Sequence, residues 1–388
     1  MISAEEVKEL SSRCVKCGLC LASCPVYQEI LTEEASPRGR VQLAKHIFHG
    51  QEEKSSGVSE KLAEAFYLCT SCNACSVSCP SQIKPTEVIQ EGREEIFAAG
   101  GAPEPVKAVK ENILNTANVY AAKKEDRTAV YPAALRERIG AKGPRKADTV
   151  LFLGCVASYL DMKIVPSFIK IMDAAKVDYT LFAEEELCCG LPLYVMGDKK
   201  NFRKNAKEVI DMIKKTGARE IVTPCAGCYK TFRKYYPEVG DMGVQIYHSV
   251  HYILKLIEMK ALDFDLKTNK KVTYHDPCDL GRTFEIFDEP REVLKAVLEH
   301  EPLELERSRL LARCCGGGGS VTAVGPELAA EMAKTRIKDA EEVGAEVIVS
   351  GCSTCKDNLR KGLKLIPKAE RPKIRVKDIT EIVAEAIT

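Results

Sequence analysis

The stretches REIVTPCAGC (219–228) and AEVIVSGCSTC (345–355) decide the fold, because each runs from a short apolar, β-branched segment directly into a C-x2-C pair. Two further stretches, TVLFLGC (149–155) and KVTYHDPC (271–278), end in the same way on a single cysteine. Apolar runs bounded by glycine or proline are typical of buried strands. The sequence therefore predicts four strands that each deliver a cysteine at the carboxyl end.

These cysteines belong to two sets of five, which we call the first and the second five-cysteine set. The first set has the spacing C-x32-CC-x35-C-x2-C and consists of Cys155, Cys188, Cys189, Cys225 and Cys228. The second has the spacing C-x35-CC-x36-C-x2-C and consists of Cys278, Cys314, Cys315, Cys352 and Cys355. Equivalent cysteines lie 123 to 127 residues apart, which indicates an internal duplication.

Helical patterns lie between the predicted strands at 199–217 and 326–344, and each is closed by a glycine. Alternating strands and helices predict two duplicated subdomains, each with a parallel sheet, at residues 148–262 and 263–388. Open α/β folds bind ligands in the loops after the strands, so we expect the cysteines of each set to converge there.

Glycines follow both Cys-Cys pairs, and we interpret Gly190, Gly316 and Gly317 as residues that bind a cofactor. A glycine lets the backbone pass close to a bulky cluster and leaves its N–H group available to the cluster's sulfurs. The alternative for the run Gly316 to Gly319 is a flexible loop.

The remaining eight cysteines form two copies of C-x2-C-x2-C-x3-C followed by proline, the pattern of bacterial ferredoxins. In such pairs the fourth cysteine of one copy binds the cluster of the other copy. The spacing therefore predicts one cubane [4Fe-4S] cluster on Cys14, Cys17, Cys20 and Cys79. It predicts a second cubane cluster on Cys24, Cys69, Cys72 and Cys75. Two structural zinc sites are the alternative, but zinc sites do not require this eight-cysteine arrangement.

The composition excludes several classes of protein. A chain of 388 residues with 45% hydrophobic residues can bury a core, so its 18 cysteines are not needed as disulfide staples. A net charge of +1 argues against a nucleic-acid partner, and we expect none. The charged start MISAEEVKEL and the lack of a long apolar run predict a cytoplasmic protein, where clustered cysteines are metal ligands.

The region before the duplication divides in two. Residues 1–100 carry the ferredoxin motifs, and the helical spacing in VQLAKHIFHG (41–50) and SEKLAEAFYL (59–68) predicts a mainly helical domain. Residues 101–147 are interpreted as a linker with some helix, and contain ten Lys or Arg against five Asp or Glu. That excess indicates a solvated surface, or else a docking site for an acidic partner.

The whole pattern resembles the CCG-domain family, and within it the D subunit of heterodisulfide reductase. The match rests on the ferredoxin motifs, on SPRGRVQLAK between them, and on LGCVASY, ELCCG, TPCAGCYKTF, YHDPCDLGR and SGCSTC. The broader family includes iron–sulfur subunits of glycolate oxidase and of anaerobic glycerol-3-phosphate dehydrogenase. The resemblance implies that each five-cysteine set binds a noncubane [4Fe-4S] cluster at the place where a disulfide is cleaved.

The resemblance also implies partners. A membrane-bound cytochrome b or a soluble flavoprotein would supply electrons in a hetero-oligomeric complex, and the substrate would be a thiol or disulfide coenzyme. With the cytochrome as partner, the chain would lie on the inner face of the membrane. No G-x-G-x-x-G motif occurs, so a flavin or NAD would sit on another polypeptide.

Four polar residues beside the second set are candidate catalytic residues: His275, Asp276, Arg282 and Lys356. A histidine can protonate a departing thiolate near neutral pH, and Arg or Lys can hold an anionic tail such as a sulfonate or phosphate. Their alternative roles are structural hydrogen bonds and ion pairs. Lys230 and Arg233 are the comparable residues of the first set.

Two functional hypotheses follow. Cleaving a disulfide takes two electrons, whereas iron–sulfur clusters pass them singly, so two complete five-cysteine sets favour a disulfide reductase. The substrate would be the mixed disulfide of coenzyme M and coenzyme B (CoM-S-S-CoB) or an analogue. The alternative is an electron-transfer subunit of a flavin-dependent 2-hydroxyacid or glycerol-3-phosphate dehydrogenase. A purely structural zinc protein would leave the cysteine spacing unexplained.

Overall fold

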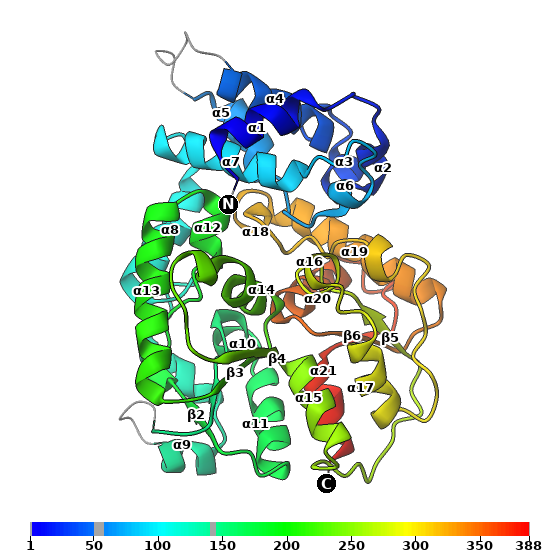
Figure 1. The fold of residues 1–388 in the computed structure, drawn as a ribbon. Helices are drawn as coiled ribbons and strands as arrows, with labels where there is room; N and C mark the ends of the chain where they lie inside the picture. Colours follow the sequence, from blue (N-terminus) through cyan, green and yellow to red (C-terminus); the bar gives the residue numbers. More distant parts are fainter. Residues whose placement is uncertain (1, 50–57, 140–144, 388) are drawn as a thin grey trace.

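The computed structural model describes residues 2–49, 58–139 and 145–387. Its N-terminal part is helical, as predicted, and lies at the top of Figure 1. The helices of this part are α1 (Ala4–Ser12), α2 (Leu19–Ser23), α3 (Pro25–Ile30), α4 (Pro37–His49), α5 (Glu60–Tyr67), α6 (Ala74–Val77) and α7 (Pro85–Ala98).

The two helices expected between the ferredoxin motifs are present as α4 and α5. Helix α5 begins at the N-cap Ser59, whose side chain accepts a hydrogen bond from the Leu62 amide. Gly50, the last residue of the predicted VQLAKHIFHG helix, lies outside the described residues. Helix α7 packs against α1, α4 and α5, and also against α12 of the following unit. It therefore joins the helical part to the rest of the molecule.

The segment predicted as a linker is built into the fold. It contains α8 (Glu104–Thr116), the 3-10 helix η1 (Lys124–Val130) and α9 (Ala133–Ile139), while 140–144 lie outside the described residues. Helix α8 packs against α12 and α18, which belong to different α/β units. The helical content agrees with the sequence, but α8 contacts both units and lines the site between them, so this segment is more than a connection.

The first α/β unit has four parallel strands in the order β2-β1-β3-β4. The strands are β1 (Thr149–Leu151), β2 (Tyr179–Leu181), β3 (Glu220–Thr223) and β4 (Gln245–His248). Val150 of the central strand pairs with Thr180 and Ile221. The helices are α10 (Cys155–Tyr159), α11 (Ile164–Ala174), η2 (Ala183–Glu185), α12 (Leu191–Met196), α13 (Lys199–Thr216), α14 (Ala226–Lys230), the π-helix η3 (Thr231–Tyr235), η4 (Tyr236–Glu238) and α15 (Ser249–Glu258).

The second α/β unit has three parallel strands in the order β5-β6-β7. The strands are β5 (Val272–His275), β6 (Val347–Ser350) and β7 (Arg375–Asp378). Where the first unit has β2, the described chain of the second has two isolated bridges, Thr268 with Leu298 and Thr273 with Leu303. The helices are α16 (Gly281–Phe284), α17 (Glu289–Val297), η5 (Arg309–Leu311), α18 (Val321–Val324), α19 (Pro326–Glu342), α20 (Ser353–Leu365) and α21 (Ile379–Ala386).

The two units share a hydrophobic core, because α11 and α15 of the first pack against α21 and α17 of the second. The predicted helices 199–217 and 326–344 are α13 and α19, and all four predicted strands are present as β1, β3, β5 and β6. The fold class is thus confirmed: a helical N-terminal part followed by two duplicated units with parallel sheets (Figure 1).

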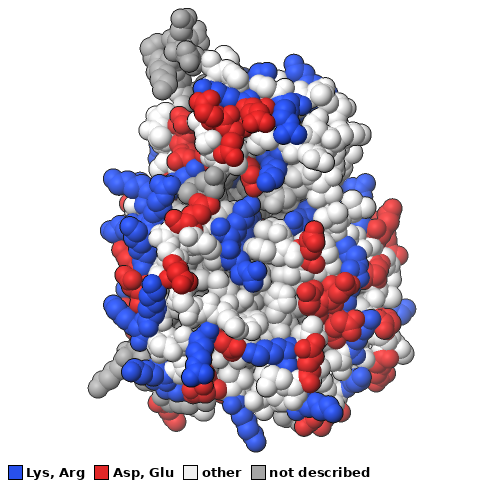
Figure 2. Space-filling model, viewed as in Figure 1, with Lys and Arg blue, Asp and Glu red and all other residues white. Residues whose placement is uncertain are grey.

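The surface is mixed in charge. Figure 2 shows basic and acidic side chains interspersed over one face, in keeping with the net charge of +1. Among the described helices, none is both long and apolar enough to cross a bilayer.

Candidate metal centres and the cavity between them

The ferredoxin cysteines form two groups in space. The outer group lines one small pocket and consists of Cys14, Cys17, Cys20 and Cys79. The inner group lines another and consists of Cys24, Cys69, Cys72 and Cys75. These are the groups that the ferredoxin spacing predicts, with the fourth cysteine of each motif exchanged. Cys17 is exposed whereas the inner group is buried, so only the outer group lies at the surface.

Local backbone geometry turns these thiols inward. Gly18 has φ of +81° and begins α2, and Asn73 has φ of +62° and begins α6, so the chain reverses tightly within each motif. Burial raises the pKa of Cys20 to about 11 and that of Cys24 to about 12. Thiols in such surroundings ionise at neutral pH only when a metal binds them, so this donor set fits an iron–sulfur cluster.

The first five-cysteine set comes together after β1 and β3 and beside α12. The Cys155 thiol interacts with the Cys188 thiol, and the Cys228 thiol interacts with those of Cys189 and Cys225. The Gly190 amide donates to the Cys188 sulfur at 3.4 Å, as expected for a glycine that supports a cluster. Gly190 has φ of +84°, a conformation that favours glycine.

Buried groups that the sequence analysis did not single out fix the position of Cys155. The Glu186 carboxylate accepts hydrogen bonds from the amides of Leu153 and Gly154 at 2.9 and 2.8 Å. It also accepts one from the Arg127 guanidinium at 2.5 Å, and both charged side chains are fully buried. The carboxylate therefore ties the end of β1 to η1, directly before Cys155.

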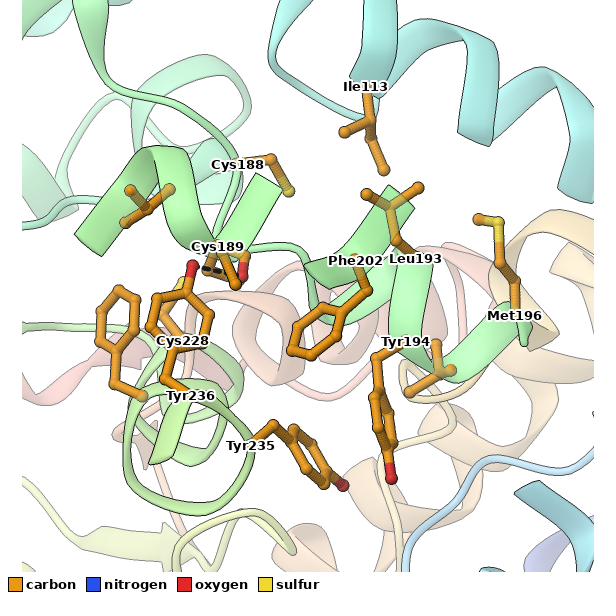
Figure 3. Close-up of a cluster of buried hydrophobic side chains, with 14 of the residues drawn as sticks. Ile113, Cys188, Cys189, Leu193, Tyr194, Met196, Phe202, Cys228, Tyr235 and Tyr236 are labelled. Atoms are coloured by element: carbon orange, nitrogen blue, oxygen red, sulfur yellow. Dashed lines mark hydrogen bonds between the residues drawn. The ribbon is translucent and has the colours of Figure 1, made fainter. Parts of the chain in front are cut away.

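An aromatic cluster lies close to Cys188 and Cys189 of the first five-cysteine set (Figure 3). The Tyr236 hydroxyl donates to the Cys189 carbonyl at 3.0 Å, which is the dashed line in the figure. Tyr194 stacks on Tyr235 with ring centroids 3.9 Å apart, and Phe202 packs edge-on against both rings. These contacts anchor the Cys-Cys loop to α13 and η3.

The second five-cysteine set repeats the arrangement after β5 and β6. The Cys315 and Cys355 sulfurs lie 3.2 Å apart, and the Cys314 thiol lies within hydrogen-bonding distance of Cys278. The amides of Gly316 and Gly317 donate to the Cys314 and Cys315 sulfurs at 3.3 and 3.4 Å. The run of glycines therefore holds the sulfurs of the Cys-Cys pair through backbone N–H groups.

Gly316 has no room for a side chain. Its φ is +83°, and a Cβ atom there would lie 2.5 Å from the Ala329 carbonyl oxygen of α19. The close approach of the two backbones requires glycine at this position.

His275, the last residue of β5, lies beside two cysteines of the second set. Its ligand atom and the sulfurs of Cys315 and Cys355 all lie within 4.8 Å of one another. Its Nδ1 accepts a hydrogen bond from Arg336 at 3.2 Å, so the hydrogen of the neutral ring is on Nε2. Among the four candidate catalytic residues, His275 is the one placed against the thiols of the second set's C-x2-C and Cys-Cys pairs.

Two of the other candidate catalytic residues, Asp276 and Lys356, form buried ion pairs within the protein. Asp276 pairs with Arg291 at 2.8 Å and accepts a hydrogen bond from the Arg309 amide. Lys356 pairs with Asp161 at 2.6 Å and with Glu381. Neither lines the cavity described below.

Arg282 bridges two parts of the molecule. It donates to the carbonyls of Cys72 and Ala312, both at 2.6 Å, so it links the inner ferredoxin group to the loop before Cys314. Of the two comparable residues in the first set, Lys230 lines the cavity and pairs with Asp279 at 2.7 Å. Arg233 is exposed and lies over the Tyr229 and Phe284 rings.

Both five-cysteine sets face one cavity of about 350 Å³. All five cysteines of the first set line it, as do four of the second: Cys278, Cys315, Cys352 and Cys355. The Cys225 thiol interacts with the Cys352 thiol, which joins the two sets. The remaining cysteine, Cys314, packs in one cluster with Cys72, which joins the second set to the inner ferredoxin group.

Known proteins share this organisation. Residues 149–233 and 272–360 each match the model of the CCG cysteine-rich domain, and residues 10–83 match a 4Fe-4S dicluster domain. The chain is 30% identical to the D subunit of dihydromethanophenazine:CoB–CoM heterodisulfide reductase from Methanosarcina mazei, over 100% of this chain and 96% of that protein. The chain belongs to the CCG family.

Other relatives place this CCG-family chain among iron–sulfur oxidoreductases. It is 26% identical to the B subunit of a fumarate reductase (CoM/CoB) from Methanothermobacter marburgensis, over 93% of this chain and 69% of that protein. The solved structure of a hypothetical protein from Helicobacter pylori shares the fold, with a TM-score of 0.55, 10% identity, and coverage of 100% of this chain and 77% of that one. The dicluster domain implies two cubane [4Fe-4S] clusters, and the cysteines of the CCG domains suggest further iron–sulfur sites.

Proposed function

We propose that this CCG-family chain is the catalytic subunit of a disulfide reductase, which reduces CoM-S-S-CoB or an analogue. The observation that carries the proposal is the shared cavity lined by nine cysteines of two complete five-cysteine sets. A disulfide in this cavity would have one set beside each sulfur. Cleavage takes two electrons, and each set would hold a cluster that supplies one of them.

The cubane clusters of the two ferredoxin groups would bring electrons from a partner. The outer group reaches the surface through Cys17, the inner group is buried, and Cys72 of the inner group contacts Cys314 of the second set. These contacts support a relay that runs from the surface to the cavity. A membrane-bound cytochrome b or a soluble flavoprotein is the electron donor that we propose, within a hetero-oligomeric complex.

The protein's own groups would orient the sulfurs and carry a proton. The amides of Gly190, Gly316 and Gly317 donate to cysteine sulfurs, and such donors stabilise negative charge on a cluster. His275 does not itself line the cavity, but its Nε2 hydrogen would lie beside Cys315, which does, so it could donate to sulfur there. Arg336 fixes the ring by its hydrogen bond to Nδ1.

The test compares the wild-type holoprotein with Cys315→Ser. Under anaerobic conditions with reduced viologen as donor, we expect wild type to reduce CoM-S-S-CoB or a simple disulfide. We expect the variant to lose this activity by at least about 100-fold, because a ligand that lines the cavity is removed. Dithionite should still reduce the cubane clusters in the variant, as seen by EPR.

A thiol titration separates this proposal from a pure electron-transfer function. Addition of coenzyme M to the oxidised protein should produce a new paramagnetic signal. If the spectrum does not respond to thiols while a 2-hydroxyacid and a flavoprotein together reduce the clusters, the electron-transfer function holds instead.

A further inference from the structure

The cavity carries no cation that is free to bind an anion. Among the described residues that line it, the charged ones are two lysines and two aspartates: Lys230, Lys361, Asp279 and Asp357. Each lysine is paired with an aspartate at 2.7 Å, Lys230 with Asp279 and Lys361 with Asp357. Apart from the cysteines, the charged side chains of the lining therefore cancel in pairs.

The two ion pairs differ in burial, and therefore in the free energy needed to break them. Lys230 is 6% exposed, and separating it from Asp279 would leave an unpaired charge in a buried place, which is strongly unfavourable. Lys361 is 51% exposed and lies one helical turn after Asp357 on α20. Exposed pairs of this kind contribute little to stability, so an anion could recruit Lys361 at low cost.

Three arginines near the cysteines add no positive charge to the lining of the cavity. Arg127 is held by Glu186, and Arg282 donates to backbone carbonyls. Arg93 is fully buried and donates to the carbonyls of Phe66, Cys69 and Val195. None of the three lines the cavity.

Part of the cavity lining is apolar. It is formed by α8 and the turn after it, with Val106, Val109 and Val119, and by Val195 and Met196 of α12. Ile113 of α8 is directed towards Leu193 of α12, so buried side chains hold these two helices together (Figure 3). Apolar arms of a substrate would be buried here favourably, whereas an unpaired anion would lose its hydration.

We infer, in a refinement that rests on the proposed function, that the substrate is a disulfide with apolar, uncharged arms, or with a single anionic group placed at Lys361. A substrate with several anionic groups, such as CoM-S-S-CoB, would find too few cations. The reaction would break the S–S bond with two electrons supplied by the viologen or the natural donor. With two protons from solvent it yields two thiols.

The experiment measures kcat/KM of the holoprotein with reduced viologen for three probes. They are dipropyl disulfide, its analogue with one terminal carboxylate, and CoM-S-S-CoB. We expect kcat/KM for dipropyl disulfide and for the monocarboxylate to exceed that for CoM-S-S-CoB by at least about tenfold. Equal or better use of CoM-S-S-CoB would overturn the inference and leave the proposed function intact.

A gain of function tests the same reasoning on the apolar part of the lining. Val109 is half-buried in α8, where Val109→Lys adds a cation and Val109→Met adds comparable length without charge. The ratio of kcat/KM for CoM-S-S-CoB to that for dipropyl disulfide should rise at least about tenfold in the lysine variant relative to the methionine variant. An unchanged ratio counts against the inference. If dithionite reduces the clusters but no probe is reduced, the proposed function fails and the inference falls with it.

Discussion

The ion pair between Glu186 and Arg127 should be the main support of the first five-cysteine set. In Glu186→Gln, one carboxylate oxygen becomes an NH2 group that faces the backbone N–H of either Leu153 or Gly154, and the Arg127 cation loses its charged partner. Breaking a fully buried pair in this way costs about 3–5 kcal/mol. A loss of about 4 kcal/mol corresponds to a fall in Tm of about 5 °C for a chain of this size.

The assay is anaerobic thermal unfolding, with iron content measured on the same samples. The double variant Arg127→Met/Glu186→Gln removes both charges, so its loss should be at least about 2 kcal/mol smaller than the sum of the single losses. Lys107→Gln breaks an exposed pair with Glu104 and serves as the control, with a change below about 1 °C. A Glu186→Gln protein that melts within about 2 °C of wild type would refute the reasoning.

Three further outcomes are expected. Iron analysis of anaerobically purified protein should approach about 16 atoms per chain, and a content near 8 with stoichiometric zinc would contradict the cluster assignment. Gly316→Ala should lose about a quarter of the iron, since its Cβ meets the Ala329 carbonyl. Gly344→Ala, also at positive φ but with open space around Cβ, should retain it, and equal losses would exclude the close contact as the cause. Burial raises the pKa of the N-cap Asp378 to about 7, above its unfolded value near 3.8, so its contribution to stability is lost as pH rises from about 4 through 7. Asp378→Asn keeps the cap and should be more stable than wild type by about 2–4 kcal/mol at pH 8.5 and by less than half as much at pH 5, whereas parallel pH profiles would contradict this.

The strands and the cysteine groups could be predicted because their signals are local. A run such as VIVS (347–350) is β-branched and fully buried in the structure, and the cysteine that follows leaves the strand where parallel sheets bind ligands. The exchange between the ferredoxin motifs is likewise fixed by short spacings. The meeting of both sets in one cavity was implied by the family resemblance but not by the residue spacing, because it depends on how α15 and α17 pack across two units.

The candidate Lys356 illustrates why neighbours in sequence were a poor guide to the site. Adjacent residues of a helix point about 100° apart, so Lys356 is directed away from Cys355 towards Asp161. The face of α20 that lines the cavity carries Thr354, Asp357 and Lys361, which follow helical spacing.

The two copies of the duplication are not equivalent in the assembled molecule. Cys314 of the second set contacts Cys72 of the inner ferredoxin group, while the first set is joined to the second through Cys225 and Cys352. An electron that enters at Cys17 would therefore meet the second set before the first. The duplicated units supply two similar sites. In the relay that we propose, the helical part packs against Cys314 and would therefore deliver electrons to the second set first.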